Sequence, residues 1–392
     1  MAYKTELDYI NSNADIVIRA LDVGPGDCLL VQTGSQNILI DTGNVGWRHL
    51  LPAALKRYGA TTLHKVIITH PHIDHDGNFM SILEDTDNFT VNTCYTNGIT
   101  LKKASMQEYQ YRTLLGNKLK NLKTGDTLDF GNGTLWTTLW PHSTFVTEMQ
   151  RRTDNNIDKY GNISYNADDD SDSGSYGNED MLETNAYTYS MNNASIVGRL
   201  TKGNFSMLFT GDAGAAVWQS QTESVMGADG TVTKQTFRAG YKVDPSLCKS
   251  TVFKAAHHSQ SAANLQGFIR DAVQPEHIIM TGGDHQNAYS LSDSGTLANP
   301  KKWTKLIPRI VSINKFNNIC NVPLTNMWCT RQHGDIHIGI FANHYTVYPD
   351  NRDWIWTQTW TDLVNKSIKL TDPKRTAIYW CDGISMGTVT SS

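Results

Sequence analysis

Short apolar runs separated by turn residues mark the first part of the chain. Residues 16–23, 28–33 and 37–41 are apolar or alternate, and glycine-rich turns separate them, so three strands are expected. Residues 47–59 have the apolar spacing of a helix that closes on a glycine. Residues 64–70 then form a compact β-branched strand that ends in a histidine cluster. The pattern predicts strands and helices that alternate, with polar chemistry at a strand end.

The same alternation continues toward the C-terminus. Helical spacing marks residues 76–87, 105–122 and 265–273. Strand patterns mark residues 91–97, 126–141, 192–214, 248–258, 276–285 and 327–349, with 126–141 expected as a hairpin around Gly-Asn-Gly. This order of elements predicts an α/β fold.

Composition shifts divide the chain. Residues from 143 to about 190 include a polar, acidic, glycine-rich stretch that predicts a flexible insertion, and residues 219–240 are expected to form a loop or a hairpin. We expect an N-terminal segment at 1–13, one domain at 14–345 that carries the insertion, and a C-terminal extension at 346–392 packed on that domain.

Composition and charge narrow the function classes. The 392 residues, 39% of them hydrophobic, suffice for a large buried core. A net charge of −4 gives no broad basic footprint for nucleic acid. The sequence has no leader pattern, no apolar run long enough to span a membrane and no CxxC pair among its six cysteines. We therefore expect a cytoplasmic protein without a membrane span, a disulfide framework or a cysteine zinc site.

The stretch HPHIDHD, residues 70–76, carries the strongest chemical signal. His70 and His72 are two positions apart and can face one ion, while Asp74 and His75 can face a second. Imidazole and carboxylate ligands suit zinc, manganese or iron. Burial of so many polar groups without a metal would be costly, so the cluster predicts a metal site.

Two later residues complete this predicted site. Asp212 in LFTGDAG and His257 in FKAAHH each follow an apolar run, as the first cluster does. Asp212 can bridge two ions because a carboxylate offers one oxygen to each. Two ions roughly 3.5–4 Å apart would clamp a hydroxide and a phosphoryl or acyl oxygen. Taken alone, His257 would more often be structural and the Gly-Asp loop a turn, so both assignments depend on the first cluster.

These motifs resemble a known family. HPHIDH resembles the signature loop of the metallo-β-lactamase fold, and LDVGPGDCLLVQTGSQNILIDTG resembles the opening of its ComEC/Rec2-type competence branch. KTGDTLDFGNGTLWTTLWP, NNASIVGRLTKGNFSMLFTGDA, FKAAHHSQSAAN and CTRQHGDIHI resemble later segments of that branch in the same order. The resemblance covers about residues 14–342. It implies an αββα sandwich with a binuclear metal site at the strand ends, and hydrolysis of a phosphodiester, usually DNA.

The resemblance also implies roles for particular residues. The implied metal ligands are His70 and His72 for one ion, Asp74 and His75 for the other, Asp212 as the bridge and His257 as the late histidine.

Other residues are implied around these ligands. Asp41 sits where the fold keeps a carboxylate that orients a ligand imidazole, and Asp27 would support the same loop, with turn capping as the alternative for both. Asp74 or a bound water is the candidate proton acceptor. His258 could donate a proton, contact phosphate or be structural. His142 is the candidate for an extra histidine ligand found in many relatives.

The sequence also departs from the branch. Pro25 replaces the usual glutamine of DVGQGD, HHGS reads HHSQS from His257, and DHQNAYS stands where a Tyr-Gly-His-Pro end is usual. These changes lie around the expected substrate mouth and leave the substrate open. The membrane channel region of full competence proteins is not found, so we expect a free-standing hydrolase and not DNA uptake.

The acidic stretch partly matches a calcium-binding loop. Asp168, Asp170, Asp172 and Glu179 fall at positions 1, 3, 5 and 12 of that loop, but Ser173 stands where the loop needs glycine. A disordered acidic lid is the favoured interpretation.

The C-terminal region is rich in tryptophan, with Trp354, Trp356, Trp360 and Trp380. These rings could stack on bases. Their spacing favours a packed strand face instead.

The sequence thus predicts a metal-dependent phosphodiesterase that uses two divalent ions, Zn or Mn, and a hydroxide that bridges them, with DNA as the expected substrate. A first alternative is a hydrolase of a small phosphodiester, such as a cyclic nucleotide or phosphocholine ester, or of a lactone. A second is a binding module with a relic metal site.

Overall fold

The structure is a computed structural model of the chain. It describes residues 5–24, 26–34, 36–101, 107–154, 191–218, 222–226, 232–237, 243–259, 263–281, 316–317, 320–350, 376–380 and 385–389.

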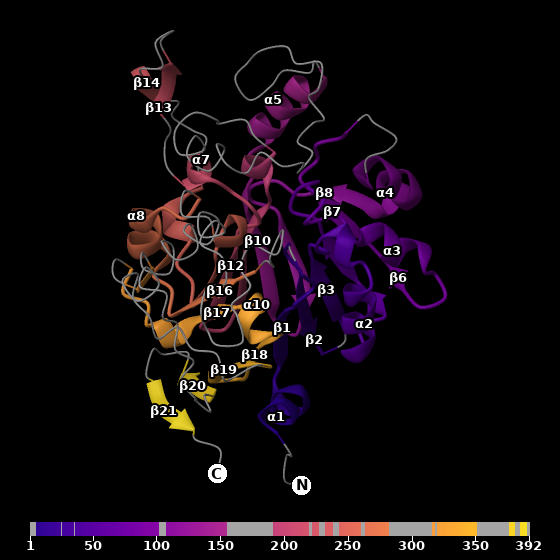
Figure 1. Cartoon of the computed structure of the whole chain (residues 1–392), viewed down its shortest axis with the longest axis vertical. Helices are drawn as coiled ribbons and strands as arrows, with labels where there is room; N and C mark the ends of the chain where they lie inside the picture. The colour runs from indigo at the N-terminus through magenta and orange to yellow at the C-terminus, as the bar shows by residue number, and fades with distance from the viewer. Residues whose placement is uncertain are drawn as a thin grey trace, which may run out of the picture.

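Two β-sheets form the centre of the described structure (Figure 1). The first has the strand order β21 (Ser385–Val389), β20 (Thr376–Trp380), β19 (His344–Pro349), β18 (Ile336–Ile340), β1 (Ile16–Ala20), β2 (Leu29–Thr33), β3 (Gln36–Ile40), β5 (Lys65–Ile67), β7 (Cys94–Thr96) and β8 (Leu119–Asn121). The second has the order β17 (Met327–Cys329), β16 (His277–Met280), β15 (Val252–Lys254), β12 (Phe205–Phe209), β11 (Val197–Lys202), β10 (Thr134–Trp140) and β9 (Thr127–Gly131). Two short pairs, β4 (Thr62–Leu63) with β6 (Thr90–Val91) and β13 (Thr222–Met226) with β14 (Val232–Phe237), lie outside these sheets.

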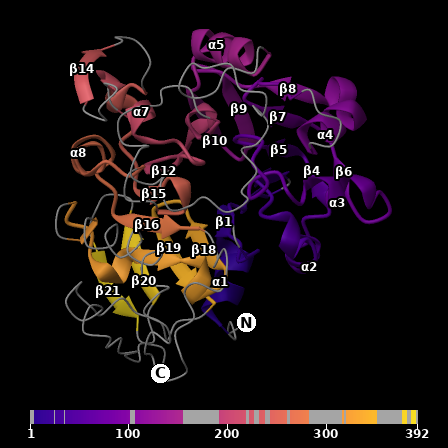
Figure 2. The same ribbon diagram turned by 45° about the horizontal axis from the view of Figure 1, so that its top comes forward.

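A continuous apolar core joins the two sheets. In the first sheet Ile18 pairs with Val31 on one side and Ile338 on the other, so early and late parts of the chain share this sheet (Figure 2). Trp136 of β10 and Met207 of β12 pack into the same buried cluster from the second sheet. Burial of each such side chain stabilises the fold by about 1.5–3 kcal/mol.

Helices cover both outer faces of the sheets. The first sheet is covered by α2 (Leu50–Arg57), α3 (Phe79–Glu84) and α4 (Gln107–Leu115), whose buried apolar side chains form one cluster with that sheet. The second is covered by α5 (Ser143–Asp154), α7 (Ala215–Trp218), α8 (Gln266–Phe268) and the π-helix η6 (Ile269–Val273). The fold is therefore the expected α/β sandwich, with its layers in the order helices, sheet, sheet, helices. Further helices are α1 (Glu6–Asn13), which packs Ile10 on β18, and α10 (Thr330–His333).

Parallel pairing brings the chemically active loops to one edge. β3, β5, β7 and β8 run parallel within the first sheet, and β12, β15, β16 and β17 run parallel within the second. Carboxyl ends of parallel strands meet at one sheet edge, where ligands usually bind. The loops that carry Asp41, His70, Asp212 and His257 all leave these ends.

Two regions differ in detail from the sequence prediction. The helix expected at 105–122 ends at Leu115, because residues 119–121 pair with β7 as strand β8. Residues 143–154, assigned by sequence to the insertion, form α5, which buries Phe145 and Met149.

Other predictions fall on parts of the chain that the structure leaves out. The calcium-loop match at 168–179 and the tryptophans Trp354, Trp356 and Trp360 lie outside the described residues. Trp380 falls in β20 of the C-terminal extension, which adds strands to the first sheet. Within the described ranges, no helix combines the length and apolarity that crossing a membrane would need.

His277 gives the fold a predicted dependence on pH. Trp328 Nε1 donates a hydrogen bond to His277 Nδ1 at 3.1 Å, and burial lowers the pKa of His277 to about 3. In the unfolded chain the imidazole of His277 takes up a proton near pH 6.5, but in the folded chain it does so only near pH 3. As the pH falls below 6.5, proton binding therefore favours the unfolded state and the folded state loses stability. Between pH 7.5 and pH 5 this residue should remove about 2 kcal/mol from the free energy of unfolding.

The measurement is urea unfolding of the wild type and of His277→Asn at both pH values. Asparagine does not titrate, so the stability difference between the two chains should narrow by about 2 kcal/mol at the lower pH. A difference that does not change with pH would contradict the prediction.

Candidate metal centre

Backbone hydrogen bonds hold the HPHIDHD loop at the end of β5. Thr42, after β3, donates from its amide and its hydroxyl to the carbonyl of His75, at 2.6 and 2.9 Å. The amide of Asp27, before β2, donates to the carbonyl of Asp74 at 3.1 Å. Side chains at the end of β5 are therefore placed by the loop after the neighbouring strand β3 and by the loop before β2, the strand beyond it.

The three histidines of the loop converge. The ring centroid of His70 lies 4.6 Å from that of His72 and 4.1 Å from that of His75. The Nδ1 atom of His70 lies 3.1 Å from both the Thr69 and the Ser195 hydroxyls, while its Nε2 atom is buried without a hydrogen-bond partner. Burial holds the pKa of His70 well below its usual range, so its ring is neutral.

The carboxylate of Asp41 fixes the ring of His75. His75 Nδ1 lies 2.8 Å from Asp41 Oδ2, and Asp41 also accepts hydrogen bonds of 2.7 Å from the amide and hydroxyl of Thr69. This contact leaves His75 Nε2 directed at Asp212, 3.1 Å from Oδ2. A carboxylate behind a histidine sets the tautomer and ring orientation that metal ligation requires.

His258 has the same arrangement on the other side of the site. Its Nδ1 lies 3.2 Å from Asp27 Oδ1. Its Nε2 lies 2.9 Å from Asp74 Oδ2 and 3.4 Å from Asp212 Oδ2. Ligand atoms of Asp74, His75, Asp212 and His258 all lie within 4.8 Å of one another, and all four residues are buried.

The charges of this cluster are balanced tightly. Burial alone would raise the pKa of Asp74, but His75 and His258 outweigh burial and hold that pKa well below its usual range. Burial alone would lower the pKa of His75. The nearby carboxylates of Asp212, Asp41 and Asp74 outweigh burial and hold that pKa well above its usual range. Asp212 Oδ1 is buried without a hydrogen-bond partner. The cluster therefore offers ionised carboxylates, imidazoles whose second nitrogen is held by a carboxylate, and buried ligand atoms without a hydrogen-bond partner. These are features that suit binding of divalent cations.

His257 and His142 are placed differently. His257 Nε2 lies 3.6 Å from Asp212 Oδ2, and its side chain is 13% exposed, against 7% for that of His258. His257 thus borders the four-residue cluster, while His258 belongs to it. His142 is exposed and, in the described part of the chain, lies outside both groups of potential ligands. Of the other predicted ligands, Asp74, His75 and Asp212 belong to the four-residue cluster. His70 and His72 lie outside it, and the His70 ring contacts those of His72 and His75.

An unusual turn places these two histidines. His257, His258 and Ser259 have φ values of +47°, +46° and +72°. Such values are rare in non-glycine residues and carry strain. The sequence therefore keeps a strained turn beside the cluster, as functional sites often do.

Ser195 is a site residue that the sequence reasoning did not single out. Its hydroxyl accepts a hydrogen bond from the amide of Asp212 at 3.0 Å and lies 3.1 Å from His70 Nδ1. It thereby links the loop after β5 to the loop after β12. The available signal was a lone serine at the start of an apolar run, which is too common to be specific.

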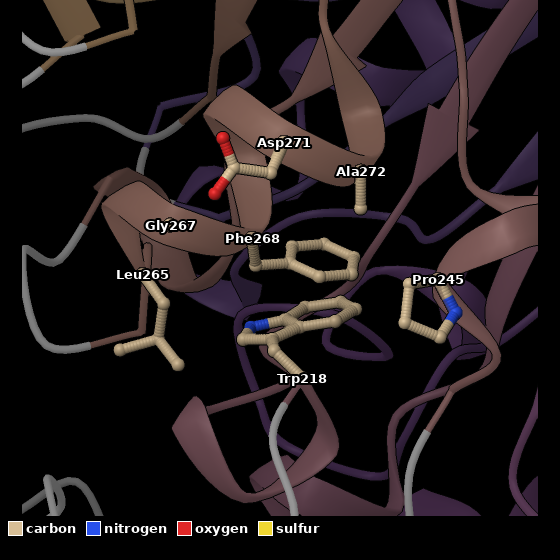
Figure 3. A pocket seen from close by; sticks show the side chains of 7 residues that line it. All are labelled: Trp218, Pro245, Leu265, Gly267, Phe268, Asp271 and Ala272. Carbon is tan, nitrogen blue, oxygen red and sulfur yellow. The ribbon is translucent and has the colours of Figure 1, made fainter.

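A separate pocket is lined by residues that follow Asp212 and by residues that follow His258. It has a volume of about 420 Å³ and is lined by Trp218, Pro245, Leu265, Gly267, Phe268, Asp271 and Ala272 (Figure 3). Trp218 and Phe268 stack with centroids 4.8 Å apart, and Trp218 Nε1 donates to the Ala263 carbonyl at 2.7 Å. This packing ties the segment after His258 to the helix after Asp212, and so supports the site from outside.

The contact between Asp41 and His75 carries a prediction. Asp41→Asn should keep the fold, because asparagine tolerates the φ of +58° at this position, but it should no longer hold the His75 tautomer. Such changes typically weaken metal affinity by about 10–100-fold. Calorimetric titration with Zn²⁺ and Mn²⁺ measures this affinity, with Asp129→Asn, an exposed position of strand β9, as the control. Unchanged affinity would show that Asp41 has no such role.

Comparison with known proteins agrees with the fold. The family model described as the metallo-beta-lactamase superfamily matches residues 21–266. Similar solved structures include the metallo-beta-lactamase fold protein YhfI from Bacillus subtilis, with 11% identity over 81% of this chain and 98% of that one, at a TM-score of 0.38. They also include BJP-1, a subclass B3 metallo-beta-lactamase of Bradyrhizobium japonicum, with 13% identity over 50% of this chain and 60% of that one, at a TM-score of 0.26. A third is rubredoxin oxygen:oxidoreductase from Desulfovibrio gigas, with 12% identity over 53% of this chain and 40% of that one, at a TM-score of 0.28. The chain thus spans less than two thirds of the last two proteins.

Proposed function

The chain belongs to the metallo-β-lactamase superfamily, whose members are typically metal-dependent hydrolases. We propose that it is a metal-dependent phosphodiesterase that cleaves DNA.

One observation carries the proposal. Buried carboxylates and imidazoles from separate strand ends converge, and atoms of His70 and Asp212 lie buried there without hydrogen-bond partners. We assign His70 and His72 to one ion, Asp74, His75 and His258 to the other, and Asp212 to both. This assignment places His258 at the ligand position for which the sequence pattern favoured His257, because His258 lies within the compact cluster.

The chemistry follows from these groups. Two divalent ions, Zn or Mn, would supply a water with a pKa near neutrality and positive charge for the phosphoryl oxygens. Asp41 and Asp27 orient the rings of His75 and His258 from behind. Asp74 would accept a proton as the water attacks phosphorus. His257, the more exposed of the paired histidines, would contact the phosphate or protonate the leaving oxygen.

The choice of DNA rests on the competence-branch motifs. The stretches LDVGPGD, NILIDTG and FKAAHHS contain, in that branch's order, Asp27, Asp41 and the paired histidines. In the structure Asp27 and Asp41 each contact a cluster histidine. The resemblance thus involves residues of the site itself, which supports a shared phosphodiester chemistry.

A small phosphodiester, such as a cyclic nucleotide, is the second candidate. The net charge of −4 favours it, because long DNA is bound mainly through positive charge.

The test is degradation of end-labelled single- and double-stranded DNA by the purified protein with Mn²⁺ or Zn²⁺. His75→Ala, which removes a predicted ligand, serves as the inactive variant, and Asp129→Asn serves as the active control. Metal-dependent cleavage that His75→Ala lacks would support a nuclease.

Two other outcomes are informative. Metal uptake without DNA cleavage would exclude the nuclease, and the same assay with cyclic nucleotides and phosphocholine esters would test the second candidate. A protein that takes up no metal would be a binding module with a relic site, and the proposal would be wrong.

A further inference from the structure

A buried lysine lies directly behind the candidate metal centre. Lys254 is the last residue of β15, and only 1% of its surface is exposed. Lysine is rarely buried completely unless its charge is paired, because an unpaired buried ammonium is costly. The position of Lys254, three residues before His257, therefore calls for a specific reason.

The ammonium of Lys254 joins two loops. Its Nζ atom forms an ion pair with Asp27 and donates a hydrogen bond of 3.0 Å to the carbonyl of Gly211. The hydroxyl of Thr281, after β16, donates to the other oxygen of Asp27. The loops before β2, after β12 and after β16 therefore meet at this ion pair.

Each partner of Lys254 leads directly to the metal cluster. Gly211 immediately precedes Asp212. The amide of Asp27 donates to the Asp74 carbonyl, and its carboxylate lies 3.2 Å from His258 Nδ1. Lys254 is thus one contact away from three residues of the cluster without touching their ligand atoms.

We propose that Lys254 is a positioning residue of the metal centre. Its ammonium fixes Asp27 and the Gly211 carbonyl relative to each other. Asp27 in turn orients the His258 ring, and the Gly211 peptide places Asp212. The inference rests on the proposed metal centre and adds to it a residue that the ligand motifs do not include.

The same ion pair would disfavour one of the two potential metal sites. Ligand atoms of Asp27, Asp41 and His75 also lie within 4.8 Å of one another, so these residues form a second potential metal group. The Lys254 ammonium already provides a cation at Asp27. A metal ion would be repelled there and favoured at Asp74, Asp212 and His258.

The test compares Co²⁺ binding by Lys254→Met with binding by the unsubstituted chain. Methionine is also unbranched and is one heavy atom shorter than lysine, so it fills most of the same space but removes the charge. Val252→Ala, which removes buried side-chain atoms from the same strand without touching the ion pair, is the matched control for lost stability. Calorimetry gives affinity and stoichiometry, and the visible absorption of bound Co²⁺ reports ligand geometry.

We expect Lys254→Met to weaken Co²⁺ affinity by about 10–100-fold and to change the absorption spectrum, as loss of groups that orient ligands typically does. Val252→Ala should bind Co²⁺ with unchanged affinity and spectrum. Lys254→Met leaves Asp27 buried without its cation and could fail to fold. The double variant Asp27→Asn with Lys254→Met removes both charges, and it should show the same altered spectrum.

The outcomes separate this inference from the proposed function. No Co²⁺ uptake by the unsubstituted chain would overturn the metal centre itself, and this inference with it. Folded Lys254→Met could instead bind Co²⁺ with the same affinity and spectrum as the unsubstituted chain, or the double variant could do so. Either result would overturn this inference and leave the metal centre in place. A spectral change of the same size in Val252→Ala would also overturn it, because the effect would then be structural.

Discussion

Replacement of Asp212 by asparagine is expected to lower metal-dependent hydrolysis by at least about 10³-fold. Asp212 Oδ2 lies 3.1 Å from His75 Nε2 and 3.4 Å from His258 Nε2, while Oδ1 has no hydrogen-bond partner, so the two oxygens are available to two ions. Asparagine keeps the shape but has one oxygen and no charge. Loss of several kcal/mol of electrostatic stabilisation corresponds to about this fall in rate.

The assay is the initial rate of phosphodiester cleavage across a Mn²⁺ titration, with metal stoichiometry measured by calorimetry on the same protein. Asp212→Asn should bind fewer ions than the wild type, and excess metal should not restore the rate. Asp271→Asn provides the control, because the Asp271 carboxylate pairs with Arg270 at the surface. Wild-type activity in Asp212→Asn would remove Asp212 from the mechanism.

The sequence predicted most of the ligand set because most of it is local. His70, His72, Asp74 and His75 stand within six residues after a strand, and burying such a cluster without a metal would be costly. Asp212 could be added because it too follows an apolar strand. Strand ends are the positions that a parallel sheet brings together, so sequence alone was enough to group these residues.

The choice between His257 and His258 could not be made from the sequence. It depends on three consecutive residues with positive φ, which turn His258 toward Asp74 and leave His257 at the border. Nothing in HHSQS signals such a turn, because the residue types there usually avoid it. Adjacent residues of one motif can therefore exchange roles through backbone conformation alone.

Lys254 and Ser195 were missed for a related reason. A lysine at the end of an apolar strand usually reaches solvent, and a serine at the start of one is common. Their importance depends on partners more than 100 residues away: Lys254 pairs with Asp27, and Ser195 contacts His70. Residues that support ligands through distant contacts leave no local pattern.

The Gly26→Ala substitution should lower the free energy of unfolding by about 3 kcal/mol and abolish tight metal binding. A Cβ at this position would lie 2.1 Å from the carbonyl oxygen of Asp74, and the φ of +113° is one that side chains rarely adopt. Backbone strain of about 1–3 kcal/mol adds to an overpacking cost of similar size. The clash falls on the carbonyl that accepts the Asp27 amide, so the loop that carries Asp74 and His75 must move.

Gly59→Ala separates strain from displacement of the ligands. Gly59 also has a positive φ, +66°, but a Cβ there would meet no atom within 4 Å, so the change should cost only about 1 kcal/mol and leave metal binding intact. Urea unfolding and calorimetric titration with Mn²⁺ on both variants measure the two effects. If Gly26→Ala lost stability but bound Mn²⁺ as tightly as Gly59→Ala, the backbone contact between Gly26 and Asp74 would not set the ligand geometry. Metal loss confined to Gly26→Ala would instead show that the glycine-rich loop before β2 is part of the metal site, because its lack of side chains lets the ligand loop approach.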